Sequence, residues 1–236
     1  MTTLLSIRDL SSYYGASRAL SGLSLDVARG EQIALIGRNG MGKTTLLKSI
    51  MGLIPDRRGA IDLGGKAMIG AKPEEIARAG IAYVPEGRGV FGALSVIENL
   101  VMAARPGLDG QRRWTLARVL EVFPRLAQRR ANGGHQLSGG EQQMLSIGRA
   151  LMTNPDLVLL DEATEGLAPL IAKEIWNILD VIRAEGIATI VVDKDHRSLS
   201  KVADRMVIMG KGEIAFAGTP AALAAEPALL ERHLGV

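Results

Sequence analysis

Cysteine is absent from the 236-residue sequence, and aromatic residues make up only 3% of it. The lack of cysteine excludes disulfide bonds and metal sites with thiolate ligands. The scarcity of aromatic residues argues against nucleic-acid binding, because single strands are usually held on platforms of stacked aromatic side chains. We therefore expect no nucleic-acid partner.

Long apolar runs are also missing. No run approaches the ~20 consecutive apolar residues that a helix needs to cross a bilayer. Residues 1–12 lack the charged-then-apolar pattern of a secretory signal. These absences favour a cytosolic location. With 47% hydrophobic residues, the chain can still bury a sizeable core, as one large domain or as a core with a subdomain.

Basic residues are unevenly distributed, although the formal net charge is only +3. Between residues 105 and 130 the acidic residues are Asp109 and Glu121, whereas arginines are frequent. The arginines of this segment are Arg105, Arg112, Arg113, Arg118, Arg125, Arg129 and Arg130. The segment is either a solvated helical face or a surface that meets lipid headgroups or an acidic partner.

Strand patterns alternate with helical ones at both ends of the chain. Strands are predicted at 23–27, 32–36, 60–63, 81–84, 157–161 and 187–192, and a hairpin at 206–216. Helices are predicted to begin near Lys43, Lys72, Pro169, Thr219 and Glu226. The helix at 169–185 has the length of a crossover between parallel strands.

From about residue 87 to residue 155 the strand patterns disappear. Helices are predicted here at 95–104, 111–122 and 138–152. We therefore predict an α/β fold in a single domain, 1–236, with an antiparallel β portion. Its core is formed by 1–87 and 156–236, and a helical subdomain at 88–155 is inserted between them.

A glycine-rich loop follows the predicted strand at 32–36. Residues 37–44 read Gly-Arg-Asn-Gly-Met-Gly-Lys-Thr, the phosphate-loop pattern with an additional glycine at Gly40. Glycines let backbone N–H groups curl around phosphates, and the following helix N-terminus favours anions. Lys43 then offers a charge to the phosphates and Thr44 a hydroxyl to Mg²⁺. A chance glycine turn before a helix is the alternative.

Two carboxylates follow the apolar strand at 157–161. The segment 157–162 reads Leu-Val-Leu-Leu-Asp-Glu. Ligands of open α/β sheets bind at the carboxyl ends of strands, so Asp161 is suited to Mg²⁺ and Glu162 to an attacking water. Solvated acids at an ordinary strand end are the alternative, but a preceding phosphate loop favours the catalytic interpretation.

The segment 137–141 reads Leu-Ser-Gly-Gly-Glu. Ser138 and Glu141 fit a capping box at the start of a helix. A capping box does not require Gly139 and Gly140, which leave a bare helix N-terminus that suits a phosphate. Since the chain already has a phosphate loop, the simplest inference is that this second cradle serves a nucleotide bound to another subunit.

Together these motifs resemble the ATPase subunit of ATP-binding-cassette (ABC) transporters over nearly the whole chain. Within that family the chain is most similar to the smaller ATPase of branched-chain amino acid importers. The stretches that carry this likeness are 83–91 (Tyr-Val-Pro-Glu-Gly-Arg-Gly-Val-Phe), 139–152 and 165–169 (Glu-Gly-Leu-Ala-Pro). The resemblance implies a P-loop NTPase fold of the ABC ATPase type, with ATP and Mg²⁺ as cofactors.

The resemblance also assigns roles to individual positions. Nucleotide-binding residues would be Tyr14, Gly37, Asn39, Gly40, Gly42, Lys43, Thr44, Thr45, Glu86, Ser138, Gly139, Gly140 and Glu141. Metal-binding residues would be Thr44, Glu86 and Asp161. Catalytic residues would be Glu162, Lys43 and Lys194. Tyr14 would stack on adenine, with Tyr13 as the competing candidate. Ser138 and Gly140 would reach the γ-phosphate held by the opposite subunit.

Several positions depart from the general family. Glu86 stands where the family usually has glutamine, although glutamate is usual in the branched-chain subgroup. Lys194 stands where the general family has a switch histidine, and His196, two residues further on, is the alternative switch. Ala163 and Ala168 replace a common proline and an acidic residue, which weakens the inference about interface communication but not about ATP binding.

The resemblance implies ATP hydrolysis that powers uptake of branched-chain or related amino acids through a separate transmembrane permease. The expected partners are a second ATPase subunit, identical or related, the permease subunits and, indirectly, a periplasmic or extracellular solute-binding protein. The chain would then lie peripherally at the cytoplasmic face of the inner membrane. Alternatives are an importer of urea or short amides, a non-transport ABC ATPase acting on ribosomes or DNA, and a regulatory binding module.

Overall fold

The computed structural model describes residues 2–235; Met1 and Val236, the ends of the predicted domain, lie outside the described residues. Two sheets form the β portion. The four-stranded antiparallel sheet has the order β2 (Ser17–Ala28), β1 (Thr3–Tyr14), β4 (Arg57–Leu63) and β5 (Lys66–Ala67). The six-stranded sheet has the order β10 (Glu213–Gly218), β9 (Arg205–Gly210), β3 (Gln32–Ile36), β8 (Ala188–Val192), β7 (Leu157–Asp161) and β6 (Ile81–Val84). The predicted strands and the hairpin are therefore present.

The central strands β3, β7 and β8 are parallel and have every residue buried. Strands covered on both faces read as continuous apolar runs, which is why these segments do not alternate with polar residues. In β3, Ala34 and Ile36 face one hydrophobic core, whereas Ile33 and Leu35 face another. The second core includes the buried face of helix α1 (Lys43–Ile50) and the inner side of the four-stranded sheet.

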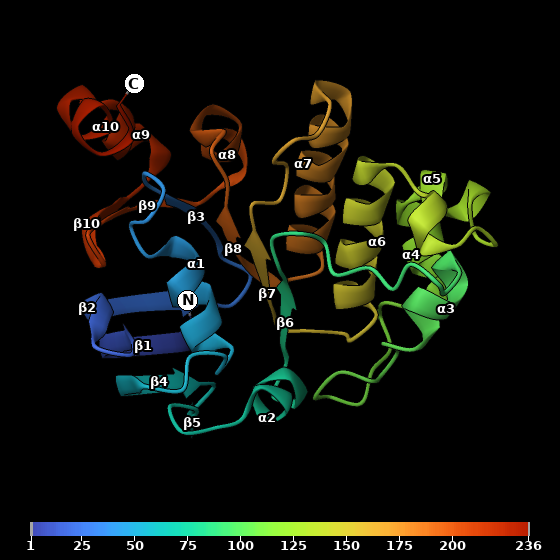
Figure 1. Cartoon of the computed structure of the whole chain (residues 1–236), viewed down its shortest axis with the longest axis horizontal. Helices are drawn as coiled ribbons and strands as arrows, with labels where there is room; N and C mark the ends of the chain where they lie inside the picture. Colours follow the sequence, from blue (N-terminus) through green and yellow to red (C-terminus); the bar gives the residue numbers. More distant parts are fainter. Residues whose placement is uncertain (1, 236) are drawn as a thin grey trace.

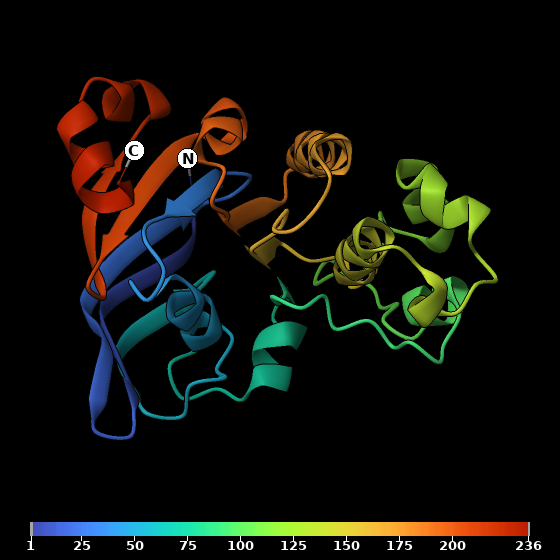
Figure 2. The ribbon, with the colours of Figure 1, turned by 45° about the horizontal axis from the view of Figure 1, so that its top comes forward.

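Helices fill the chain between β6 and β7. They are α3 (Val96–Val101), α4 (Leu116–Val122), α5 (Pro124–Gln128), the short 3₁₀ turn η1 (Gly134–Gln136) and α6 (Gly139–Leu151). Figures 1 and 2 show α3 to α5 at one end of the molecule and the blue strands at the other, with α6 and α7 (Pro169–Ala184) between them. The remaining helices are α2 (Pro73–Arg78), α8 (His196–Val202), α9 (Pro220–Ala224) and α10 (Pro227–Leu234). None of the helices within residues 2–235 is both long and apolar enough to cross a membrane.

The prediction of a helix at 111–122 was wrong about where the helix starts. The backbone N–H of Trp114 donates to the Asn154 side chain at 2.8 Å, so this residue is committed to a contact outside the helix. The helix begins at Leu116, after Thr115, whose hydroxyl accepts from the N–H of Arg118 at 3.2 Å. The short helices α5 and α8 were not predicted, because five to seven residues hold too little periodicity to be distinguished from a turn.

The arginines of the segment 105–130 are largely paired within the chain. Arg125 makes two hydrogen bonds of 2.9 Å to the carboxylate of Glu174 on α7. Further ion pairs are Arg113–Asp109, Arg118–Glu121, Arg118–Glu185 and Arg129–Glu141. This pairing favours the interpretation as a solvated helical face, because most of the positive charge is compensated locally.

The carboxyl ends of β3, β6, β7 and β8 meet at one edge of the six-stranded sheet. The glycine-rich loop follows β3, Glu86 follows β6, Asp161 ends β7 and Lys194 follows β8. Parallel strands bring their carboxyl ends together, so segments distant in sequence are placed around a single site.

Asn99 stabilises the connection between β6 and the helical segment. It is fully buried, and its amide nitrogen lies 3.0 Å from the carbonyl oxygens of Phe91, Leu94 and Ser95. Its side-chain oxygen accepts from the N–H of Phe91 at 3.1 Å. We predict that Asn99→Ala lowers the free energy of unfolding by about 2 kcal/mol or more, because three backbone carbonyls and the N–H of Phe91 lose their partner in a buried amide. Urea denaturation measures this change, and an unchanged midpoint would contradict it.

Candidate functional site

A cavity of about 600 Å³ opens at this edge of the sheet. It is lined by most of the glycine-rich loop, the start of α1 and two carboxylates. Its lining residues are Ser17, Arg18, Ala19, Asn39, Gly40, Gly42, Lys43, Thr44, Thr45, Glu86, Glu162, Lys211 and Gly212. The phosphate loop, Glu86 and Glu162, which the sequence predicted as parts of a nucleotide site, thus line one cavity.

The glycine-rich loop needs its glycines for conformation and for space. Gly42 has φ 99°, and Gly37 has φ 148°, where an added Cβ would lie 2.6 Å from the carbonyl oxygen of Met209. Both positions therefore exclude residues with a side chain. The ammonium of Lys43 folds back over the loop and donates to the carbonyls of Gly37 at 2.7 Å and Arg38 at 2.9 Å. Burial lowers the pKa of Lys43, which an arriving phosphate would oppose.

Asp161 links the glycine-rich loop to the neighbouring strand β6. Its carboxylate is fully buried; Oδ1 accepts from the Thr44 hydroxyl at 3.0 Å and Oδ2 from the Tyr83 hydroxyl at 3.0 Å. Burial raises the pKa of Asp161, and these two hydrogen bonds oppose that shift. Burial and the charge of Asp161 raise the pKa of Tyr83, so its hydroxyl remains a donor. The hard oxygen atoms of Thr44 and Asp161 fit a Mg²⁺ ion.

Glu162 adopts the left-handed backbone conformation, with φ 52°. This region is unfavourable for a residue with a Cβ and is often retained at functional sites. The next N–H, that of Ala163, donates to the Val192 carbonyl at 3.3 Å, which ties the segment after Glu162 to the end of β8. The strained turn leaves Glu162 lining the cavity rather than continuing β7.

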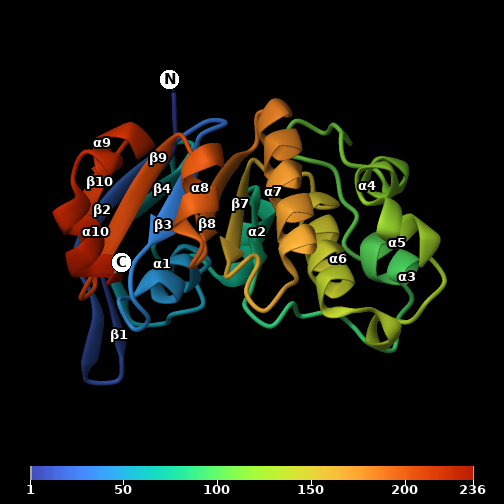
Figure 3. The same ribbon diagram turned by 90° about the horizontal axis from the view of Figure 1, so that it is seen from above.

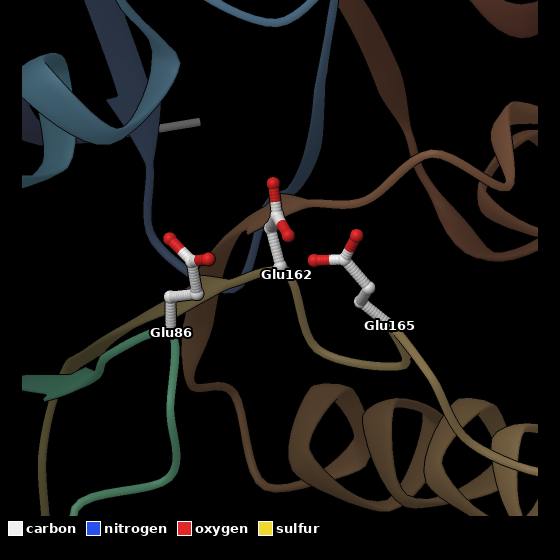
Figure 4. A group of neighbouring side chains, drawn as sticks. All are labelled: Glu86, Glu162 and Glu165. Atoms are coloured by element: carbon white, nitrogen blue, oxygen red, sulfur yellow. The ribbon is translucent and has the colours of Figure 1, made fainter.

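Three carboxylates gather at the mouth of this site. Glu86, Glu162 and Glu165 each place an oxygen within 4.8 Å of the others. Figure 4 shows Glu162 and Glu165 on the loop after β7, facing Glu86 on the segment after β6. Lys194 forms an ion pair with Glu165, and this contact raises the pKa of Lys194. His196 begins α8. Neither Lys194 nor His196 belongs to the described residues that line the cavity.

The segment 138–141 starts α6 with the predicted capping box. The N–H of Ser138 donates to the Glu141 carboxylate at 2.8 Å, and the N–H of Glu141 donates to the Ser138 hydroxyl at 3.3 Å. None of residues 138–141 is among the described residues that line the cavity. Figure 3 shows α6 separated from α1 by α7 and the central strands. The structure therefore keeps this segment apart from the chain's own phosphate loop.

Tyr14 also lies outside the cavity lining, as far as residues 2–235 show. It ends β1, has 52% of its surface exposed and pairs with Ser17, which does line the cavity. The competing Tyr13 ring carries the guanidinium of Arg58 at 4.9 Å from its centroid. Tyr13 thus already contacts a cation, whereas Tyr14 is exposed beside a residue of the cavity wall, and its role as the adenine-stacking residue stays a prediction.

Sequence reasoning missed several residues of the site. On the cavity wall these are Ser17, Arg18, Ala19, Lys211 and Gly212. Two polar residues behind the cavity, Tyr83 and Asp193, were also missed. Tyr83 was noted only as part of a family stretch, and Asp193 was not considered. Asp193 is buried and accepts hydrogen bonds from the N–H and hydroxyl of Thr164, each at 2.8 Å. A polar residue within or directly after a buried parallel strand was the available signal in both cases.

Comparisons with known proteins agree with this geometry. Residues 20–165 match the family model described as ABC transporter. The chain is 41% identical to the high-affinity branched-chain amino acid transport ATP-binding protein BraG of Pseudomonas aeruginosa, over 98% of this chain and 100% of that protein. It is 34% identical to the lipopolysaccharide export system ATP-binding protein LptB of Haemophilus influenzae, over 92% and 91%.

Solved structures show the same fold. The ADP conformation of MJ1267, an ATP-binding cassette of an ABC transporter, superposes with a TM-score of 0.85 at 25% identity and covers 98% of both chains. An ATP-binding subunit of an ABC transporter gives a TM-score of 0.83 at 31% identity, over 99% of this chain and 97% of that one. The predicted α/β cassette fold is therefore confirmed.

We predict that Tyr83→Phe raises the Mg²⁺ concentration needed for half-maximal nucleotide binding by about threefold to tenfold. Removing the hydrogen bond from Tyr83 frees the buried carboxylate of Asp161 to rotate, which loosens an oxygen expected to bind Mg²⁺. A fluorescent ATP analogue titrated with Mg²⁺ measures the effect. Tyr13→Phe is the matched control; equal behaviour of the two variants would contradict the role of Tyr83.

Proposed function

The chain belongs to the ABC transporter family, and from this premise we propose that it is the ATPase subunit of an importer of branched-chain amino acids. The observation that carries the choice of solute is the 41% identity to BraG over the whole of both chains. The LptB relatives share the cassette at lower identity, 34% or less. The ATPase itself acts on ATP and water, and its membrane partners select the solute.

One subunit supplies most of each catalytic site. The loop around Gly42 and the ammonium of Lys43 bind the β- and γ-phosphates, with Asn39 and Thr45 also on the cavity wall. Thr44 and Asp161 would hold Mg²⁺, with Glu86 close by. When bound, this ion neutralises phosphate charge and orients the terminal phosphate. Tyr14 would cover the adenine at the cavity edge.

Glu162 is proposed as the general base. Its carboxylate lies on the cavity wall, where it can accept a proton from a water placed in line with the γ-phosphate. The water oxygen forms a bond to phosphorus while the bond from phosphorus to the bridging oxygen breaks. Phosphate and ADP are the products, and the proton is held on Glu162 until they leave.

The segment 138–141 completes the site of a second subunit in this proposal. Its support is that Ser138 and Gly140 begin a helix of thirteen residues, far from the chain's own cavity. The free N–H groups of such a helix start favour an anion. Two subunits arranged head to tail would place this start over the γ-phosphate of the partner. The second subunit is a copy of this chain or a related ATPase.

A second groove of about 590 Å³ is the proposed docking site for the permease. It lies beside the segment that follows β6 and is bordered by the exposed apolar side chains of Leu53 and Met102. Arg88, Arg105 and Arg149 also line it. This combination suits a short amphipathic helix with an acidic residue. The proposed division into a core, 1–87 and 156–236, and a helical subdomain, 88–155, puts the groove at their junction.

Attachment to the membrane would then be peripheral, through permease subunits at the cytoplasmic face. A periplasmic or extracellular solute-binding protein would act on the far side of the permease, without touching this chain. This proposal includes no nucleic-acid partner. The proposal thus separates the source of energy, which this chain provides, from the choice of solute, which it does not make.

We predict that Glu162→Gln keeps ATP binding but lowers the hydrolysis rate by about 10²- to 10⁴-fold, because the amide cannot accept the proton. The variant should also accumulate as an ATP-bound dimer. Phosphate release and size-exclusion chromatography with ATP measure the two effects. Glu74→Gln, on the exposed start of α2, is the matched control. A Glu162→Gln variant that turns over ATP normally would refute the assignment.

We predict that cells lacking this chain lose uptake of labelled leucine, isoleucine and valine, and that the wild-type chain restores it. Lys43→Ala should fail because hydrolysis is lost. Leu53→Glu should fail in cells although the purified variant hydrolyses ATP, because a buried carboxylate opposes docking of the permease. Retained amino acid uptake together with lost urea uptake would instead assign the chain to a urea importer.

A further inference from the structure

An ion pair between Lys194 and Glu165 joins two loops at the mouth of the nucleotide cavity. Glu165 belongs to the loop that follows β7, and Lys194 to the loop that follows β8. The two side chains are half exposed, at 53% for Lys194 and 41% for Glu165. Both can therefore change partners without disturbing the core.

The backbone beneath this pair is fixed by a buried carboxylate. Asp193 accepts from the N–H and hydroxyl of Thr164, each at 2.8 Å, and its other oxygen accepts from the N–H of Asp195 at 2.9 Å. Thr164 precedes Glu165, and Asp193 precedes Lys194. The two loops are thus locked together one residue before the ion pair, so the long side chains are the parts that can move.

The charges around the pair are unbalanced. The carboxylate of Glu165 lies close to those of Glu86 and Glu162, with one oxygen of each within 4.8 Å of the others (Figure 4). Like charges at this distance repel one another. Lys194 is the cation that the structure pairs with this cluster, and it compensates part of the negative charge beside the cavity.

Lys194 also lies within the electrostatic reach of the phosphate loop. Besides burial, the charge of Lys194 contributes to lowering the pKa of Lys43. Glu162, next to Glu165 in the cluster, lines the same cavity as Lys43. A lysine has a flexible four-carbon stem with a compact charge at its end, so a change of rotamer can carry the ammonium from one anion to another.

We propose that Lys194 and Glu165 form a nucleotide-responsive latch, in which Glu165 holds the ammonium until a terminal phosphate arrives and Lys194 then moves to that phosphate. The latch rests on the proposed ATPase function and assigns Glu165 the role of a positioning residue. The exposed ion pair contributes little free energy. A terminal phosphate group carries about −1.5 to −2 charge and three acceptor oxygens, more than the single charge of the Glu165 carboxylate. The γ-phosphate therefore binds the ammonium of Lys194 in place of Glu165. ADP has no γ-phosphate and leaves the ion pair intact.

The latch makes opposite predictions for its two members. Loss of Lys194 removes a bond to the γ-phosphate and weakens binding of a triphosphate. Loss of the charge on Glu165 removes the competing anion and strengthens it. An ion pair with a purely structural role would instead weaken binding in both variants, and for diphosphate as well as triphosphate.

Calorimetric titration with a non-hydrolysable imido analogue of ATP and with ADP, both with Mg²⁺, tests the latch. Lys194→Ala should weaken binding of the analogue by about tenfold, the loss expected for one charged hydrogen bond, and leave ADP binding unchanged. Glu165→Gln should tighten binding of the analogue by about twofold to fivefold, the range expected for an exposed ion pair, again without effect on ADP. Lys194→Arg, which keeps the charge, should retain the preference for the triphosphate. His196→Ala is the matched control and should behave as the wild type.

Changes of the same sign in Lys194→Ala and Glu165→Gln would overturn the latch, and so would equal losses for both nucleotides. A loss of triphosphate binding in His196→Ala but not in Lys194→Ala would move the switch to His196. If Lys194→Ala does not fold, as thermal unfolding shows, Lys194→Gln provides the same loss of charge. A wild-type chain that binds neither nucleotide would refute the ATPase function, whereas normal wild-type binding with unaffected variants refutes only the latch.

Discussion

The hydrogen bond between Thr44 and Asp161 is the contact on which the site depends. It joins the start of α1 to the end of β7, across 117 residues of sequence, and the carboxylate that accepts it is fully buried. A buried carboxylate must be satisfied, or its burial destabilises the fold. Here Thr44 and Tyr83 satisfy both oxygens of Asp161. The contacts that stabilise this carboxylate therefore also place two oxygens suited to Mg²⁺, those of Thr44 and Asp161, beside the phosphate loop.

A second constraint acts on the loop after β7. Glu162 takes a left-handed conformation and Thr164 is tied to Asp193, so the segment cannot relax toward an extended strand. Strain of this kind persists only where neighbouring contacts over-determine it. The chain thereby holds Glu162 at the cavity and leaves Glu165 and Lys194 at its mouth. Within residues 162–165 a fixed backbone thus carries one carboxylate on the cavity wall and another that is half exposed.

Sequence reasoning predicted the parts of this protein whose signal is local. Eight residues or fewer are enough to recognise each of three such features: the loop 37–44, the strand ending at Asp161 and the capping box at Ser138. The structure has all three. The errors arose where distant residues decide. Asn154 sets the start of α4 from 40 residues away, and Tyr83 reaches Asp161 from 78 residues away. No periodicity in the sequence records such contacts, since they exist only once the sheet is assembled.

The start of α6 reconciles two interpretations that the sequence left side by side. Packing alone explains why both positions are glycine. A Cβ on Gly140 would lie 2.5 Å from the Ile171 side chain, and one on Gly139 would lie 3.0 Å from the guanidinium of Arg88. Capping uses the Ser138 hydroxyl only as an acceptor, from the N–H of Glu141. The hydroxyl proton and the first N–H groups of the helix remain available as donors. Capping and phosphate binding therefore draw on different atoms, and the same short segment can stabilise its own helix while completing the site of another subunit.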